Sequence, residues 1–270
     1  MWAILSLAFS LSSAAPAGCT ADEECLSAGL RCLESPTGFP CTLDYAFNQT
    51  GTCACLPQAC DTFTYAPAKP GKKQWLVVGD SISMGYIGPL AAALPNYEVV
   101  HVGPQGKAIN CDNAYFASRC MAGWLGADAY RWDVVSYNAG LHDLAFPDNE
   151  HLSVESYSGL LSKNLGYLGG KLRPDATILW MSITPVPTNP PKNCTLIPGR
   201  LESQVGVFNS AAAEAVKAAA RTVRLCDLHQ VIVDYCGAGY SSCNITQCAG
   251  PHFSSVGWEL LGSSAARCIT

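Results

Sequence analysis

Apolar runs of strand length alternate with longer helical patterns from residue 74 onward, and this alternation restricts the chain to few folds. The runs are continuous, as in strands buried on both faces, and they span 75–78, 97–102, 134–137 and 178–183, with 221–225 as a weaker fifth. Helical patterns cover 82–94, 154–172, 201–220 and 256–267. Alternating strands and helices build a parallel sheet with helices on both faces. Residues 74–270 are therefore expected to form a three-layer α/β/α sandwich around a mainly parallel five-stranded sheet.

Residues 1–17 have the pattern of a signal peptide. A short apolar run is followed by small residues that end in Ala15-Pro16-Ala17, which matches an A-x-A cleavage site. The run is too short to cross the ~30 Å hydrocarbon core of a membrane, and no later segment resembles a membrane span. These features predict a secreted protein with no membrane-spanning helix.

Cysteine usage agrees with export, because 15 cysteines is a density typical of disulfide-bonded secreted proteins. Seven of them lie in residues 18–60, which hold too few aliphatic residues for a core and should form a small disulfide-rich module. A polar linker, residues 61–73, follows. The other cysteines are expected to pair within residues 74–270, and a short loop favours Cys111 with Cys120. Sequons for N-glycosylation stand at Asn48, Asn193 and Asn244.

Charge and cysteine spacing exclude two classes of function. The chain carries 16 Lys and Arg against 21 Asp and Glu, and the basic residues are scattered rather than gathered into a stripe, so nucleic-acid binding is not expected. The sequence holds no CxxC pair of the kind that binds zinc, so no metal and no cofactor are expected. Neither pattern predicts an oligomeric state.

Four loops follow predicted strands or precede the last helix, where a parallel sheet gathers its functional groups. They are 79–83, 102–107, 138–144 and 250–258. Ser81 opens a helix directly after the first strand, where helix N–H groups favour developing negative charge. His252 can reach the same edge, and a serine nucleophile needs such a base. Structural explanations also exist, since Asp80 or Ser81 can cap the helix and His252 can be an ordinary loop residue.

Together these loops resemble the blocks of the SGNH/GDSL hydrolases over roughly residues 74–268. The resemblance implies that Ser81, in Gly79-Asp80-Ser81, is the nucleophile and that His252 is the general base. It implies a backbone oxyanion donor at Gly106. The third block, usually G-x-N-D, is Gly140-Leu141-His142-Asp143 here and looks like a G-L-H-D branch, in which the His142 imidazole replaces the asparagine amide as oxyanion donor.

The last block departs from the family pattern D-x-x-H, because Ala249 stands where the family has an aspartate. The group that orients His252 is therefore left open between Asp227, Asp234 and a backbone carbonyl.

The resemblance implies a secreted serine esterase that acts on a small-molecule or glycan ester, with an O-acetylated glycan as the first expectation and a lipid ester as the second. Two alternatives remain. The departures at residues 142 and 249 are compatible with a catalytically silent binding protein on the same scaffold. The same acyl-enzyme would also serve an acyltransferase.

Overall fold

The computed structural model describes residues 62–103, 108–144, 152–186, 200–237, 243–246 and 251–269. The expected signal peptide, the 18–60 module and the sequons at Asn48 and Asn193 lie outside these residues. Within them, five parallel strands form one sheet in the order β2-β1-β3-β4-β5. The strands are β1 (Lys73–Val78), β2 (Tyr97–His101), β3 (Val134–Tyr137), β4 (Thr177–Met181) and β5 (Val223–Cys226).

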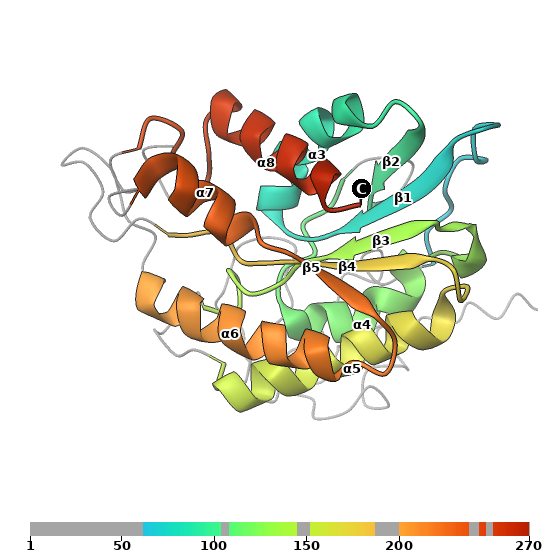
Figure 1. Ribbon diagram of the computed structural model, residues 1–270. Coiled ribbons are helices and arrows are strands. Elements are labelled where there is room, and N and C mark those ends of the chain that lie inside the picture. The colour runs from blue at the N-terminus through green and yellow to red at the C-terminus, as the bar shows by residue number, and fades with distance from the viewer. Residues whose placement is uncertain are drawn as a thin grey trace, which may run out of the picture. The chain divides into compact units, whose positions relative to one another are not determined.

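Helices cover both faces of the sheet (Figure 1), which confirms the predicted three-layer architecture. On one face lie α3 (Ser81–Ala93), α7 (Leu228–Cys236) and α8 (Ser255–Arg267), and on the other lie α4 (Ala114–Trp124), α5 (Val154–Lys171) and α6 (Glu202–Ala218). A 3-10 turn, η2 (Ala129–Arg131), precedes β3. The sequence patterns did not predict α4, α7 or η2. Among the helices of the described ranges, none combines the length and the apolarity that a membrane crossing requires.

The middle of the sheet forms the core because its strands are apolar on both faces. Trp75, Tyr137 and Trp180 are fully buried, and the rings of Tyr137 and Trp180 meet edge to face at a centroid distance of 5.2 Å. The Trp75 indole donates to Ser136 Oγ over 2.9 Å, which satisfies its one polar group inside the core. Burial of these large side chains supplies the main driving force that holds the layers together.

Helices α3 and α8 pack unusually closely because each presents a glycine to the other. A Cβ atom at Gly85 would lie 2.6 Å from the Trp258 ring, and one at Gly262 would lie 2.7 Å from the Leu90 nitrogen and 2.8 Å from the Tyr86 carbonyl oxygen. Since α3 starts at Ser81 and α8 starts shortly after His252, this contact sets the distance between the two segments that carry the predicted nucleophile and base.

Part of the expected linker belongs to the α/β domain. Phe63 is only 5% exposed, and its backbone N–H donates to Gly123 over 3.0 Å. The Tyr65 hydroxyl donates to the Trp124 carbonyl over 2.5 Å, and the Trp124 side chain is fully buried. The start of this segment, at Phe63 and Tyr65, therefore packs on the domain.

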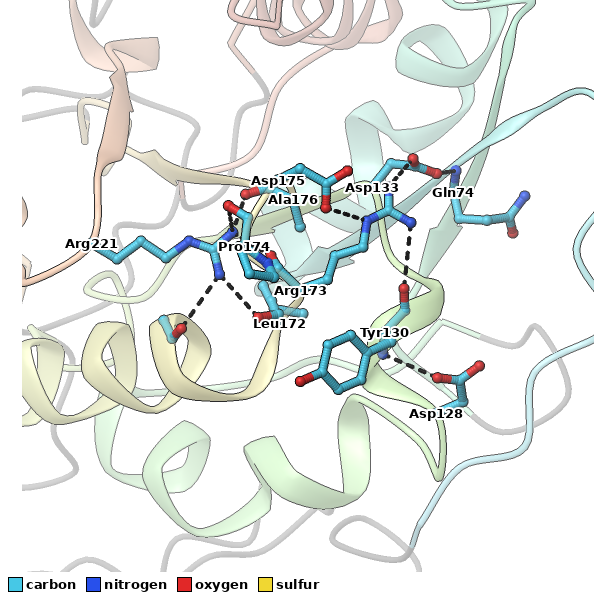
Figure 2. Close-up of polar contacts among 11 residues, drawn as sticks. Gln74, Asp128, Tyr130, Asp133, Leu172, Arg173, Pro174, Asp175, Ala176 and Arg221 are labelled. Carbon is cyan, nitrogen blue, oxygen red and sulfur yellow. Dashed lines mark hydrogen bonds and ion pairs between the residues drawn. The ribbon is translucent and has the colours of Figure 1, made fainter.

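A polar network ties the amino ends of the central strands together (Figure 2). The Arg173 guanidinium bonds Asp133, and Asp133 accepts the Gln74 backbone N–H over 2.6 Å. Nearby, Arg221 donates to carbonyls of the segment that links α5 to β4, including Leu172 over 3.1 Å and Pro174 over 3.1 Å. This network lies at the edge of the sheet opposite the predicted site and serves the fold.

Two disulfides join cysteines of the described ranges: Cys226–Cys268 and Cys236–Cys243. The predicted Cys111–Cys120 pair is wrong. Cys111 is a buried free thiol, and Cys120 is disulfide-bonded. Cys111 is held beside the turn after β1, where its N–H donates to Gly79 over 3.0 Å. Cys120 lies in α4, about 9 Å along the helix axis from Ala114, the first residue of that helix.

Candidate active site

Ser81 is the first residue of α3 and directly follows the turn after β1. The preceding Asp80 caps the helix, and its carboxylate accepts the Ile82 N–H over 2.9 Å. Asp80 is fully buried, so desolvation raises its pKa. The cap holds the Ser81 hydroxyl at the end of the helix where backbone N–H groups gather, which favours an oxyanion nearby.

His252 reaches this turn from the other end of the chain, and its Nε2 lies 2.9 Å from Ser81 Oγ. The segment that carries it is anchored directly after the histidine. Phe253 forms an isolated antiparallel bridge with Thr246, and Ser254 donates its N–H to Ile245 over 2.7 Å. Burial of the ring lowers the pKa of His252 below 6.5, although the charge of Asp80 opposes the shift. A neutral imidazole at this place presents a bare nitrogen to the serine.

The structure does not bring Asp227 or Asp234 to His252. Asp227 caps α7 by accepting the Gln230 N–H over 3.0 Å, and it also accepts the Ser182 hydroxyl over 2.9 Å. Asp234 accepts the Gln230 side-chain amide over 2.7 Å, one turn back on the same helix. Both carboxylates bond Gln230 of α7, and no acidic residue of the described ranges hydrogen-bonds the His252 ring.

His142 pairs with an acidic residue that the sequence did not single out. Its Nδ1 lies 2.9 Å from Asp112 Oδ1, and its Nε2 lies 3.4 Å from the side-chain nitrogen of Asn110. Arg200 Nε donates to the Leu141 carbonyl over 2.6 Å, which fixes the backbone just before the histidine. Gly106, the expected second oxyanion donor, lies outside the described residues.

The third loop is joined to α4 through Asp143. Both of its carboxylate oxygens accept the Ala114 N–H, at 3.0 and 3.1 Å. The side chain is fully buried, and this desolvation raises the pKa of Asp143 to about 7. Asp143 therefore connects two segments of the fold and does not reach toward the serine turn.

A second serine–histidine pair lies buried behind the nucleophile turn. Ser83 Oγ is 2.8 Å from His101 Nε2 and 2.7 Å from the Asp80 carbonyl oxygen. Burial lowers the pKa of His101 to about 4, so the ring is neutral at physiological pH. A Cβ atom at Gly79 would lie 2.6 Å from Ser83 Oγ, so the glycine makes room for this bond. The pair braces the turn from inside.

Within the described ranges, no group of three His, Cys, Asp or Glu side chains has the arrangement of a metal site. The chemistry that these residues offer is that of a serine hydroxyl, a neutral imidazole and a second imidazole beside a carboxylate.

Comparison with known proteins supports the fold. No protein-family model and no curated protein sequence matches the chain. Solved structures do match, among them a carbohydrate acetylesterase from Sinorhizobium meliloti, with 14% identity and a TM-score of 0.50, where the match covers 73% of this chain and 98% of the other. The aryl esterase of M. smegmatis matches with 18% identity, a TM-score of 0.52 and the same coverage of both chains.

A gut microbial diltiazem-metabolizing enzyme also matches, with 12% identity and a TM-score of 0.53 over 77% of this chain. The match spans about half of that longer enzyme, 48% of its length. At such identities the similarity concerns the fold alone. The α/β domain of this chain thus shares the fold of the acetylesterase and the aryl esterase, and the two loops that carry Ser81 and His252 meet at one edge of its sheet.

Proposed function

We propose that the protein is a serine esterase in which Ser81 is the nucleophile and His252 is the general base. The observation that carries this proposal is the 2.9 Å distance between Ser81 Oγ and His252 Nε2, two groups that are 171 residues apart in the chain. A serine hydroxyl is a weak nucleophile until a base within hydrogen-bonding distance removes its proton. The lowered pKa of His252 keeps that base unprotonated at neutral pH.

The reaction is acyl transfer to water. Ser81 Oγ attacks the ester carbonyl while His252 takes its proton, and the tetrahedral oxyanion is stabilised by the Ser81 N–H, the Gly106 N–H and the His142 side chain. Donors of this kind each contribute about 3 kcal/mol. His252 then protonates the leaving alcohol, and water repeats the sequence on the acyl-enzyme. No step requires a metal or an organic cofactor.

The substrate we propose is a small-molecule or glycan ester, first of all an O-acetyl group on an extracellular carbohydrate. A carbohydrate acetylesterase and an aryl esterase share the fold at a coverage of 98% of their own lengths, which supports ester chemistry on this scaffold. The disulfides Cys226–Cys268 and Cys236–Cys243 support an oxidising location, and we propose that the protein is secreted and glycosylated. Asn244, the one sequon in the described residues, is exposed.

Labelling with a fluorophosphonate probe tests the nucleophile directly, because the probe phosphonylates a serine only where a base activates it. We expect the unchanged chain and Ser255→Ala, a variant of an exposed serine at the start of α8, to be labelled. Ser81→Ala should lose the label. Labelling that persists in Ser81→Ala, or that is absent from all three proteins, would overturn the assignment. The second result would favour a catalytically silent binding protein. Two observations support that alternative: alanine stands at position 249, and Asp227 and Asp234 bond Gln230 instead of His252.

Hydrolysis and acyl transfer are separated by a further measurement. An acetylated chromogenic ester should release acetate into water at the same rate with or without a sugar acceptor. A faster turnover with the acetyl group recovered on the sugar would identify an acyltransferase that uses the same Ser81 intermediate.

A further inference from the structure

The pair formed by His142 and Asp112 joins two loops of the candidate site. The His142 ring is largely buried, with 12% of its side chain exposed, and its Nδ1 lies 2.9 Å from the carboxylate of Asp112. We propose that Asp112 is a positioning residue that holds His142 as an imidazolium, so that a cationic Nε2–H serves as the oxyanion donor. This inference rests on the esterase function proposed above and adds Asp112 to its machinery.

The proposal depends on which ring nitrogens of His142 carry a proton. An ionised carboxylate can only accept a hydrogen bond, so the contact with Asp112 requires the proton on His142 Nδ1. In the neutral ring that proton is the only one, and Nε2 is then a bare acceptor that repels an oxyanion. Only the imidazolium has a second N–H at Nε2. A histidine in place of the family's asparagine amide therefore donates to the oxyanion in this geometry only when it is charged.

The backbone places Asp112 independently of His142. Cys111 donates its N–H to Gly79 over 3.0 Å, and Ile109 donates to Val102 over 2.9 Å, so the segment 109–112 lies along the turn that carries the nucleophile. Asp112 itself has a φ of 56°, a left-handed conformation that Asp tolerates better than most residues. The carboxylate is thus presented by a fixed turn, as expected of a group that positions another.

Asn110 completes the support of this turn. Its side-chain oxygen accepts the Asp112 N–H over 2.9 Å, which directs its side-chain nitrogen to His142 Nε2, at 3.4 Å. An amide nitrogen only donates, so this contact is a hydrogen bond in the neutral ring alone, and the imidazolium gives it up. That contact is at the long end for a hydrogen bond, in contrast to the short one at Nδ1. The structure therefore ties the histidine mainly through Asp112.

Charges from every neighbouring segment act on the His142 ring. Burial is the largest single influence and opposes its charge, whereas the charge and the hydrogen bond of Asp112 favour it, as does the charge of Asp80 at the start of α3. Arg200, before α6, and His252, before α8, act in the opposite direction, and Asp143 follows His142 in its own loop. The balance raises the pKa of His142 above 6.5, which supports the proposal.

Nuclear magnetic resonance of the histidine rings tests the protonation state without any substrate. With ¹⁵N-labelled histidine and His142→Asn for assignment, we expect both ring nitrogens of His142 to be protonated at pH 7. Asp112→Asn should lower the pKa of His142, whereas Asp128→Asn, an exposed aspartate that caps η2, should leave it unchanged. A His142 ring that is singly protonated at pH 7 in the unchanged protein would refute the proposal, whether or not the protein is an esterase.

A double-mutant cycle separates positioning from a general structural role. Asp112→Asn should lower kcat about 10- to 100-fold, less than the 10²–10³-fold loss of a whole donor, and leave KM nearly unchanged because the interaction forms in the transition state. In a His142→Asn background the same change should cost less than about threefold, since an amide donor needs no charge. An equal loss in both backgrounds would mean that Asp112 only maintains the fold. If Ser81 is not labelled by the probe, the esterase proposal fails, and the titration of His142 still decides this one.

Discussion

His252 Nε2 lies 2.9 Å from Ser81 Oγ, although residue 249, three positions before the histidine, is an alanine. The position of the base is therefore set by backbone contacts and not by an acidic partner in the described residues. The bridge between Thr246 and Phe253, and the close packing of α8 on α3, hold the segment that carries it. An imidazole oriented in this way can accept a proton, but no carboxylate of the described residues hydrogen-bonds it, and only the charge of Asp80 favours the imidazolium.

The two histidines of the site should respond differently to the same substitution. His142→Asn restores an amide donor and should keep much of the esterase turnover, whereas His142→Ala should lose about 10²–10³-fold in kcat. His252→Ala should lose more, and His252→Asn should not rescue it, because an amide cannot accept a proton at neutral pH. Ester turnover of the four variants measures this. Equal collapse of His142→Asn and His252→Asn would show that the roles are wrongly assigned.

The dependence of turnover on pH follows from the opposite pKa shifts of the two rings. His252 must be neutral, and its pKa lies below 6.5, so activity rises through a value on the acid side of 6.5. His142 must be charged, and its pKa lies above 6.5, so activity falls again on the alkaline side. We expect a bell-shaped profile of kcat/KM. In His142→Asn the alkaline limb should disappear, and a profile that keeps both limbs in this variant would contradict the assignment.

Glycine 262 offers a test of the helix contact that positions the dyad. Gly262→Ala places a Cβ 2.7–2.8 Å from backbone atoms of α3, so the helices must separate, and we expect a loss of about 1–3 kcal/mol in the free energy of unfolding together with lower kcat. Gly206→Ala is the matched control. It lies in α6 with open space around the added Cβ, and it should stabilise the protein by up to about 1 kcal/mol. Urea unfolding and ester turnover of both variants give the comparison, and equal behaviour of the two would rule out the contact as the positioning element.

Asp143 links stability to pH with a sign opposite to that of most carboxylates. Its pKa in the folded protein is about 7, above the ordinary aspartate value of 3.8, so the folded state binds the proton more tightly than the unfolded state. Its contribution therefore weakens as pH rises from about 4 to 7. Asp143→Asn keeps an acceptor for the Ala114 N–H and should remove this pH dependence, while Asp143→Ala leaves that donor unsatisfied and should cost about 1–3 kcal/mol at pH 4. Thermal unfolding at pH 4, 5, 6 and 7 tests both, and identical slopes in the unchanged protein and Asp143→Asn would contradict the assignment.

The sequence predicts the strands of the core well because their burial is visible as uninterrupted apolar runs. It predicts β5 weakly because β5 is an edge strand, in which Arg224 and Leu225 are exposed and only Val223 and Cys226 are buried. The sequence does not predict helix α7 for a related reason, since only Leu228 and Ile232 of its nine residues are buried. Elements with little buried surface leave little periodicity in the sequence.

The approach of Ser81 and His252 could be predicted because both stand at the ends of recognisable elements. Asp112 could not, because it reaches His142 through a left-handed turn and two backbone bonds between separate loops, and no spacing along the chain reports such a contact. The failure of the Cys111–Cys120 pairing has the same origin, since short separation in sequence says nothing about the direction in which α4 carries Cys120.

The glycine-mediated packing of α3 on α8 also determines where the site is sensitive to substitution. When the spacing of nucleophile and base is built into two helices, the pair needs no acidic residue before the histidine to stay together. The sensitive positions then lie far from the chemistry, and we expect Gly85, Trp258 and Gly262 to tolerate little change.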